Sequence, residues 1–263
     1  MINPKKSLGQ NFLIDNNIIN KIIKLSDVEN NNIVEIGPGT GNLTKKIIDN
    51  NPKSLILIEK DHKLVNYLKK EFGSLKNLKI FNEDVLKFHF EDRINSDSII
   101  IGNLPYNISS QILAKLIKLK KWLPKYKRLV LMFQKEVADK ILAKSKSSSF
   151  GRLTVLTKAR LKIVDHFNIS ENCFFPVPKI KSTVLVFEPI INKDFKIKDI
   201  SNLEKITHVF FSKKRKMINK AFKTLFKDPL LIAEKLQIDL NLRPNKITEK
   251  EYFKITEYFE KEI

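Results

Sequence analysis

A glycine-rich turn followed by an acidic residue is the first part of the sequence that could bind a ligand. Glu35-Ile36-Gly37-Pro38-Gly39-Thr40-Gly41 begins at the end of an apolar run and leads into a segment with helical periodicity. Glycine allows a sharp turn and lets a ligand lie against the backbone. Glu59 ends the next apolar run, where a carboxylate can bind the two hydroxyls of a ribose. Gly37, Gly39 and Glu59 are therefore candidate residues for binding a nucleoside cofactor.

The other acidic residues indicate which nucleoside. Glu35 precedes the turn, and Asp84 follows a third expected strand, where it could accept a hydrogen bond from an adenine amino group. Three acids at successive strand ends suit a ligand with an ammonium and a sulfonium better than one with a pyrophosphate. The spacing is also Gly-x-Gly-x-Gly, not the Gly-x-Gly-x-x-Gly of dinucleotide sites. We predict S-adenosylmethionine as the cofactor and no metal. A dinucleotide oxidoreductase is disfavoured, because the sequence offers no recognisable catalytic His or Tyr–Lys arrangement.

The tetrapeptide Asn103-Leu104-Pro105-Tyr106 is the candidate catalytic element, because it follows the fourth expected strand, where open α/β sheets bind ligands. The N6 lone pair of adenine is delocalised into the ring, so this nitrogen is a poor nucleophile. The side-chain oxygen of Asn103 and a backbone carbonyl of Leu104 or Pro105 could accept the two N6–H groups and hold the nitrogen in line with a methyl donor. The tetrapeptide therefore predicts methyl transfer to an adenine amino group.

Two aromatic residues are candidates for holding the target base. Tyr106 would stack on it, and Phe174, in the Pro-rich segment 174–178, would form the second face of an aromatic clamp. Such stacking is worth roughly 1–3 kcal/mol per base, which offsets part of the cost of removing the base from its own stack. For Phe174 a place in the core is an equally good interpretation of the sequence.

Apolar runs of strand length alternate with helical patterns through the first two-thirds of the chain. Besides the strand expected before Asp84, the expected strands are 33–36, 55–58, 98–101 and 129–133. The expected helices between and after the strands are 42–48, 63–72, 110–119 and 135–143. This alternation predicts a parallel Rossmann-like α/β sheet of the S-adenosylmethionine methyltransferase kind. Two later strands, 161–167 and 183–187, suit an antiparallel edge.

After Pro189 only helical patterns remain, over 202–226, 229–236 and 249–259. We predict a catalytic domain over residues 1–190 and a small all-helical domain over 191–263 that binds RNA or the ribosome. Lys213-Lys214-Arg215-Lys216, followed at helical spacing by Lys220, is the candidate phosphate-binding cluster. A second basic set begins at Lys115 and ends at Arg128.

Composition limits the partners and the compartment. The net charge of +20 over 263 residues favours a polyanionic partner, although part of it follows from a general abundance of lysine. No apolar run is long enough to span a membrane. The N-terminal lysines are followed by no apolar stretch and Cys173 is the one cysteine, so we expect a cytoplasmic protein. None of the four histidines lies at metal-ligand spacing. We expect a monomer.

In order along the chain, these motifs resemble the ribosomal RNA adenine dimethyltransferases of the small-subunit type. The similarity runs nearly end to end and is carried by residues 7–13, 37–41, Glu59, Asp84, 103–109, 174–182 and 211–216. It implies that Asn11 and Leu13 join Gly37, Glu59, Asp84 and Asn103 around the cofactor. It also implies that two adjacent adenosines, in a hairpin loop near the 3′ end of small-subunit rRNA within a pre-30S particle, are dimethylated.

Two positions depart from the family pattern, and two other functions stay open. Lys181 stands where a small or acidic residue is usual, and Asn245 where an acid is usual. One alternative is the antibiotic-resistance methyltransferase that modifies large-subunit rRNA, which has a similar catalytic domain. The other is a nucleic-acid-binding assembly or transcription factor built on the same scaffold.

Overall fold

The computed structural model describes residues 10–191 and 194–262, and it divides the chain into two compact units. Unit 1 is formed by the residues up to Ala138 together with Ile163–Pro189, and unit 2 by Asp139–Lys162 together with the residues from Ile190 onward. A boundary therefore falls close to the expected one at residue 190. Residues 139–162, which the sequence patterns placed with the sheet, cluster instead with the C-terminal helices.

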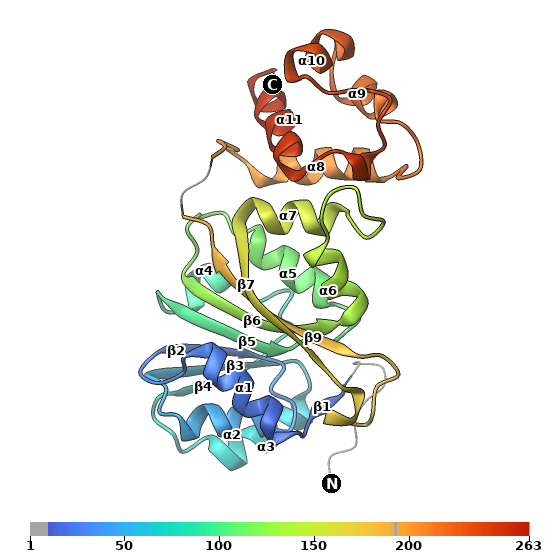
Figure 1. Ribbon diagram of the computed structural model, residues 1–263. Coiled ribbons are helices and arrows are strands. Elements are labelled where there is room, and N and C mark those ends of the chain that lie inside the picture. The colour runs from blue at the N-terminus through green and yellow to red at the C-terminus, as the bar shows by residue number, and fades with distance from the viewer. Residues whose placement is uncertain (1–9, 192–193, 263) are drawn as a thin grey trace. The chain divides into compact units, whose positions relative to one another are not determined.

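Unit 1 is built on a seven-stranded sheet with the order β4-β3-β2-β5-β6-β9-β7 (Figure 1). The strands are β2 (Asn32–Ile36), β3 (Ser54–Glu59), β4 (Leu78–Asn82), β5 (Ser98–Asn103), β6 (Tyr126–Gln134), β7 (Leu161–Ile169) and β9 (Ser182–Pro189). The pairs β2–β3, β2–β5, β3–β4 and β5–β6 are parallel, and β6–β9 is antiparallel. The predicted parallel sheet with an antiparallel edge is confirmed.

Helices cover both faces of this sheet, as the nearly continuous apolar strands require. α1 (Asn16–Ser26), α2 (Asn42–Asp49) and α3 (His62–Phe72) lie on one face, and α4 (Phe90–Arg93) and α5 (Ser109–Ile117) on the other (Figure 1). The core between the first helices and the sheet is made of side chains such as Ile22, Ile47 and Leu57, all at most 3% exposed. Because this framework is packed, the loops at the carboxyl ends of the strands are held in fixed positions.

A short antiparallel ribbon adjoins the sheet. β1 (Phe12–Leu13) pairs with β8 (Phe174–Phe175), which follows the 3-10 turn η2 (Glu171–Cys173). Phe12 lies opposite Phe175, and Leu13 lies opposite Phe174. The ribbon joins the N-terminal segment to the Pro-rich segment, two stretches far apart in the sequence.

Unit 2 is helical. Its elements are the second half of α6 (Lys135–Leu142), α7 (Arg152–Arg160), α8 (Ile200–Phe211), α9 (Asn219–Leu225), α10 (Pro229–Leu236), η3 (Pro244–Lys246) and α11 (Glu249–Glu262). α7, which the sequence patterns did not reveal, packs against α8 and α11. The predicted continuous helix over 202–226 is wrong, because α8 ends at Phe211 and α9 begins only at Asn219. The all-helical C-terminal architecture is confirmed.

Candidate active site

The glycine-rich turn forms one wall of a pocket at the carboxyl ends of β2, β3, β4 and β5. Gly37 and Gly39 have φ angles of 68° and 58°, in the left-handed region that favours glycine. A Cβ atom at Gly39 would lie 2.8 Å from Cδ1 of Phe12, whereas one at Gly37 would meet nothing closer than 3.6 Å. Gly39 therefore allows Phe12 to pack on the turn, and Gly37 leaves the backbone accessible from the pocket.

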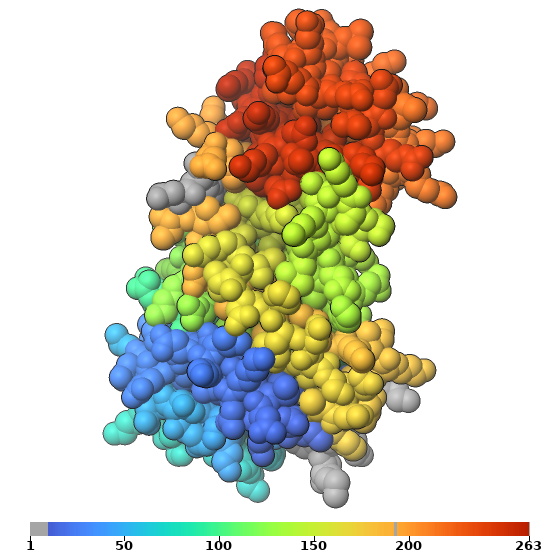
Figure 2. Space-filling view, viewed as in Figure 1, coloured from blue at the N-terminus to red at the C-terminus, as the bar shows by residue number. Residues whose placement is uncertain are grey.

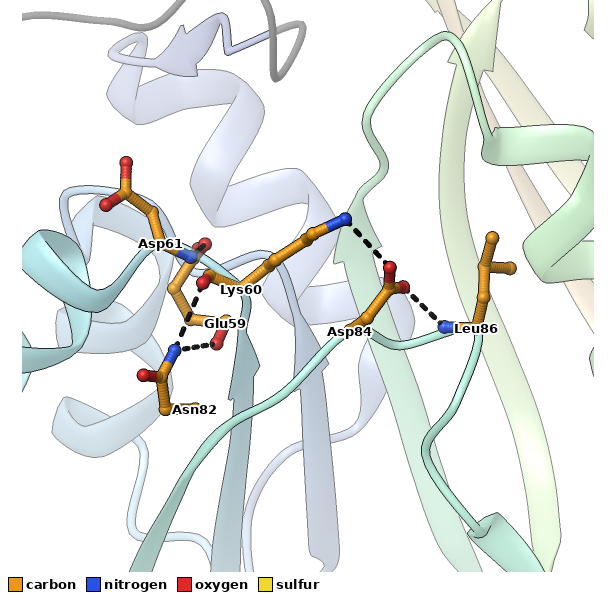
Figure 3. A network of polar contacts seen from close by, with 6 residues as sticks. All are labelled: Glu59, Lys60, Asp61, Asn82, Asp84 and Leu86. Atoms are coloured by element: carbon orange, nitrogen blue, oxygen red, sulfur yellow. Dashed lines mark hydrogen bonds and ion pairs between the residues drawn. The ribbon is translucent and has the colours of Figure 1, made fainter.

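Glu59 is held in place by backbone N–H groups at the end of β3 (Figure 3). Asp61 donates its N–H to Oε1 of Glu59 at 2.8 Å, and Gly39 donates its N–H to Oε2 at 3.3 Å. Burial raises the pKa of this carboxyl, and these hydrogen bonds oppose the rise. Each carboxylate oxygen keeps further acceptor capacity, so Glu59 can also bind two hydroxyls of a ribose.

Glu35 is the most deeply buried acid in the pocket wall, with 1% exposure. Thr44, on α2, donates its hydroxyl to Oε2 of Glu35 at 2.7 Å. Desolvation raises the pKa of Glu35 to about 8, the Thr44 hydrogen bond lowers it, and the nearby Glu59 charge adds to the rise. At neutral pH most Glu35 side chains therefore carry a proton, and a cationic ligand beside them would favour the ionised form.

Asp84 lies in the loop after β4 and is oriented from two sides (Figure 3). The Leu86 N–H donates to Oδ1 of Asp84 at 2.9 Å, and Lys60 donates to Oδ2 at 2.8 Å. The Lys60 hydrogen bond is the main reason that the pKa of Asp84 lies below its usual value. Asp84 therefore offers a negative acceptor, fixed in direction, for a donor such as an adenine amino group.

Lys115 supports the same loop from α5. Its ammonium donates to the Leu86 carbonyl at 2.6 Å, and partial burial lowers its pKa. The sequence grouped Lys115 with cations facing RNA, but the structure turns it inward. Lys115 thereby connects the loop that bears Asp84 to the helix that follows the candidate catalytic tetrapeptide.

The tetrapeptide lines the pocket beside the glycine-rich turn, because the two follow the paired strands β5 and β2. Asn103 donates its side-chain amide to the Asn11 carbonyl at 2.8 Å, which fixes the amide plane and directs the amide oxygen away from Asn11. Leu104 is buried at 1% exposure and anchors the turn, while Pro105 and Tyr106 line the pocket. The Tyr106 hydroxyl is hydrogen bonded to Oγ of Ser182 at 2.6 Å, which limits rotation of the ring.

The structure brings nearly all the predicted ligand-binding residues together. The pocket is lined by Asn11, Leu13, Gly37, Gly39, Glu59, Asp84, Asn103, Leu104, Pro105 and Tyr106, and also by Glu35 and Lys60. Of the motif at residues 7–13, the first three residues lie outside the described part of the chain. Sequence reasoning missed Lys60, Lys115 and Ser182. Of these, only Lys60 carried a usable signal, as a cation directly after Glu59.

Phe174 is not among the residues that line the pocket in this structure, and its role as the second face of an aromatic clamp stays a prediction. It is 1% exposed and belongs to the core cluster that includes Leu13 and Ile169. Because Phe174 pairs with Leu13 across the β1–β8 ribbon, the two side chains lie on the same, core-facing side. Phe175 has the opposite orientation and is 59% exposed.

The predicted phosphate-binding cations lie in unit 2 at the surface. Lys213, Lys214, Arg215 and Lys216 are exposed and occupy the turn between α8 and α9, with Lys220 exposed on α9. Lys214 donates to the Ser148 carbonyl at 2.6 Å. Asn245 accepts from the Lys146 N–H and donates its side chain to the Ser147 carbonyl, at 2.7 and 3.2 Å. Lys213–Lys216 are thus presented by a turn, whereas Lys220 lies on a helix.

Comparison with known proteins decides the family. The family model described as ribosomal RNA adenine dimethylase matches residues 1–261. The chain belongs to this family. It is 45% identical to the ribosomal RNA small subunit methyltransferase A of Pelagibacter ubique, over 98% of both chains. It is 40% identical to the protein of the same name from Malacoplasma penetrans, over 95% of this chain and 90% of the other.

Solved structures of related proteins agree with this assignment. A dimethyladenosine transferase from Plasmodium falciparum superposes with a TM-score of 0.79 and 27% identity, covering 95% of this chain and 98% of the other. The 23S rRNA methyltransferase ErmE superposes with a TM-score of 0.69 and 19% identity, covering 95% and 100%, and shows the shared fold. The predicted methyltransferase fold and the resemblance to the small-subunit dimethyltransferases are confirmed.

Within residues 10–191 and 194–262, no three His, Cys, Asp or Glu side chains are grouped so that they could hold a metal ion. No helix in the described part of the chain is long and apolar enough to cross a membrane.

Proposed function

We propose that this adenine dimethylase transfers methyl groups from S-adenosylmethionine to N6 of two adjacent adenosines in the 3′-terminal hairpin loop of small-subunit rRNA. The observation that carries the proposal is a pocket that is lined both by acids suited to a nucleoside and by the Asn103–Tyr106 turn. Membership of the family and the similarity to small subunit methyltransferase A proteins support the reaction and the substrate.

The chain's residues fit the cofactor along its whole length. Glu59, fixed by two N–H donors, is suited to the ribose hydroxyls, and Asp84 to the adenine amino group. Gly37 leaves backbone accessible beside the remaining part of the ligand, Gly39 lets Phe12 pack on the turn, and the Glu35 carboxyl suits an ammonium there. Asn11 and Leu13 complete the wall. When bound, the cofactor supplies an electrophilic methyl group on a sulfonium.

The tetrapeptide positions the target amino group. The Asn103 amide oxygen and the carbonyl of Leu104 or Pro105 accept the two N6–H groups of the adenine, which fixes the nitrogen and favours its pyramidal geometry. Tyr106 stacks on the base, and its bond to Ser182 keeps the ring in the orientation that stacking needs. No base has to remove the proton first, because it becomes acidic only when the nitrogen gains its methyl group.

The two units divide these tasks. We assign the chemistry to unit 1, which lies within residues 1–190. We assign the binding of RNA or the ribosome to the part of unit 2 that lies within residues 191–263. The exposed cations Lys213, Lys214, Arg215, Lys216 and Lys220 would contact phosphates, with shape supplying specificity. We further propose that the substrate is a pre-30S particle, that the enzyme acts as a cytoplasmic monomer and that it needs no metal.

The test is methyl transfer from labelled S-adenosylmethionine to small subunits that lack the modification, followed by nucleoside analysis. Wild-type protein should produce N6,N6-dimethyladenosine, and Asn103→Ala should lose transfer while still binding precursor subunits. Asn66→Ala, an exposed position on α3 outside the pocket, is the matched control. Labelling of large subunits alone would show the resistance-type activity, and binding without transfer by the wild type would show an assembly factor.

A further inference from the structure

Phe175 is an exposed aromatic residue beside the pocket, and no step of the proposed reaction uses it. We propose that Phe175 is the platform on which the RNA base next to the target adenosine stacks. This inference rests on the proposed function and adds to it a residue that contacts the substrate outside the pocket.

The register of the β1–β8 ribbon places Phe175 next to the pocket. Phe175 lies directly opposite Phe12, and directly opposite residues of an antiparallel pair project from the same face with Cβ atoms roughly 5 Å apart. Phe12 lines the pocket and is 8% exposed, whereas Phe175 is 59% exposed and is not part of the pocket wall. The Phe175 ring therefore extends this aromatic face outward from the pocket.

The surface around Phe175 suits RNA. Ile14, Val177 and Ile180 are between 46% and 57% exposed, and the lysines at 179 and 181 beside them are exposed as well. In Figure 2 the gold segment that contains β8 lies at the surface beside the blue N-terminal part of unit 1. An exposed aromatic ring among apolar side chains and cations suits the bases and phosphates of a single-stranded loop.

This surface is also continuous with the site of the target base. Ser182 follows Lys181 directly, and its hydroxyl is bonded to Tyr106 in the pocket. An RNA strand whose adenosine stacks on Tyr106 has to leave the pocket past neighbouring residues of the chain. The segment between Phe175 and Ser182 adjoins that exit.

Base extrusion explains why an outer platform is needed. When one adenosine leaves the loop's stack, its neighbour loses one stacking partner, which costs a few kcal/mol. An exposed ring beside the pocket restores that partner and accepts any base, because every base has a π-face. For two adjacent adenosines, the ring would hold one of them while the other occupies the pocket.

The experiment compares Phe175→Ala, Phe175→Leu and Phe175→Trp with the wild type, using an RNA hairpin of the small-subunit loop with 2-aminopurine beside the target adenosine. Removing one base stack should raise the Kd for this hairpin about 5- to 150-fold. We expect that rise for Ala and Leu and near-normal affinity for Trp, with S-adenosylmethionine affinity within twofold of wild type. The fluorescence quenching of 2-aminopurine should disappear in Ala and Leu and return in Trp. Val164→Ala, which removes an apolar side chain 43% exposed on β7, is the matched control.

The outcomes separate this inference from the proposed function. If wild-type protein does not methylate the small subunit, the proposed function fails. If the wild type is active but Phe175→Ala binds the hairpin as Val164→Ala does, the stacking inference fails alone. The inference also fails if Leu restores binding, or if Phe175→Ala weakens binding to assembled subunits and not to the hairpin, because Phe175 would then contact an apolar or protein surface.

Discussion

Replacing the buried Glu35 by Gln should make the ligand-free protein more resistant to unfolding, increasingly so at higher pH. The pKa of Glu35 is raised by desolvation from about 4.5 to about 8, whereas in the unfolded chain it has its ordinary value. The folded state therefore binds one proton more than the unfolded state between these values, and the wild type loses stability as pH rises through that window. At 1.36 kcal/mol per pH unit, the full loss is about 5 kcal/mol above pH 8.

Gln keeps the shape of the side chain and can still accept the Thr44 hydrogen bond, but it does not ionise. Free energies of unfolding should be measured by urea titration at pH 5.5 and 8.5. The difference in this free energy between the variant and the wild type should be about 3 kcal/mol larger at pH 8.5 than at pH 5.5. Any pH-independent cost of the substitution cancels in this comparison. Glu29→Gln, at an exposed position, is the control. If the difference in free energy of unfolding is the same at both pH values, the pKa of Glu35 is not raised in the folded protein.

Three further predictions concern the same pocket. Ala at Gly37 and at Gly39 should each cost about 1–2 kcal/mol for the positive φ. Gly39→Ala should cost roughly 1–3 kcal/mol more in urea unfolding, because its methyl group would meet Phe12 at 2.8 Å; equal losses would contradict this. Tyr106→Ala should slow the second methyl transfer more than the first in single-turnover assays, because after one transfer a single N6–H remains for the acceptors; Tyr106→Phe is the control, and equal slowing would count against the role of stacking. Lys115→Met should raise the KM for S-adenosylmethionine about 2- to 10-fold at unchanged kcat, from a hydrogen bond worth roughly 0.5–1.5 kcal/mol, with rescue by Arg. A fall in kcat alone would assign Lys115 a different role.

The sheet and the pocket were predictable because their signals are local. The central strands β2, β3 and β5 are short apolar runs, and Gly37, Glu59 and Asn103 lie at or directly after the ends of these strands. Since the carboxyl ends of parallel strands share one edge, the order of motifs along the chain is enough to place them together.

Contacts between distant segments were not predictable in this way. Lys115 lies in a run of lysines, and only the packing of α5 beside the loop after β4 turns its ammonium to the Leu86 carbonyl, 29 positions away. The helix predicted over 202–226 failed for a related reason. Helical spacing of the cations continues through Lys213–Lys216, but the chain leaves the helix there, and the cations lie on a turn.

The neighbouring residues Phe174 and Phe175 show what a sequence pattern alone cannot decide. Side chains alternate between the two faces of a strand, so a shift of one residue exchanges the core for the surface. The sequence offers two adjacent phenylalanines and no means of choosing the inward one. The pairing of β8 with β1 makes the choice, because Leu13, which belongs to the core cluster and also lines the pocket, lies opposite Phe174, while Phe12 lies opposite Phe175. In this structure the exposed aromatic residue of the segment is therefore Phe175, and a substitution at the buried Phe174 should also change the stability of the core.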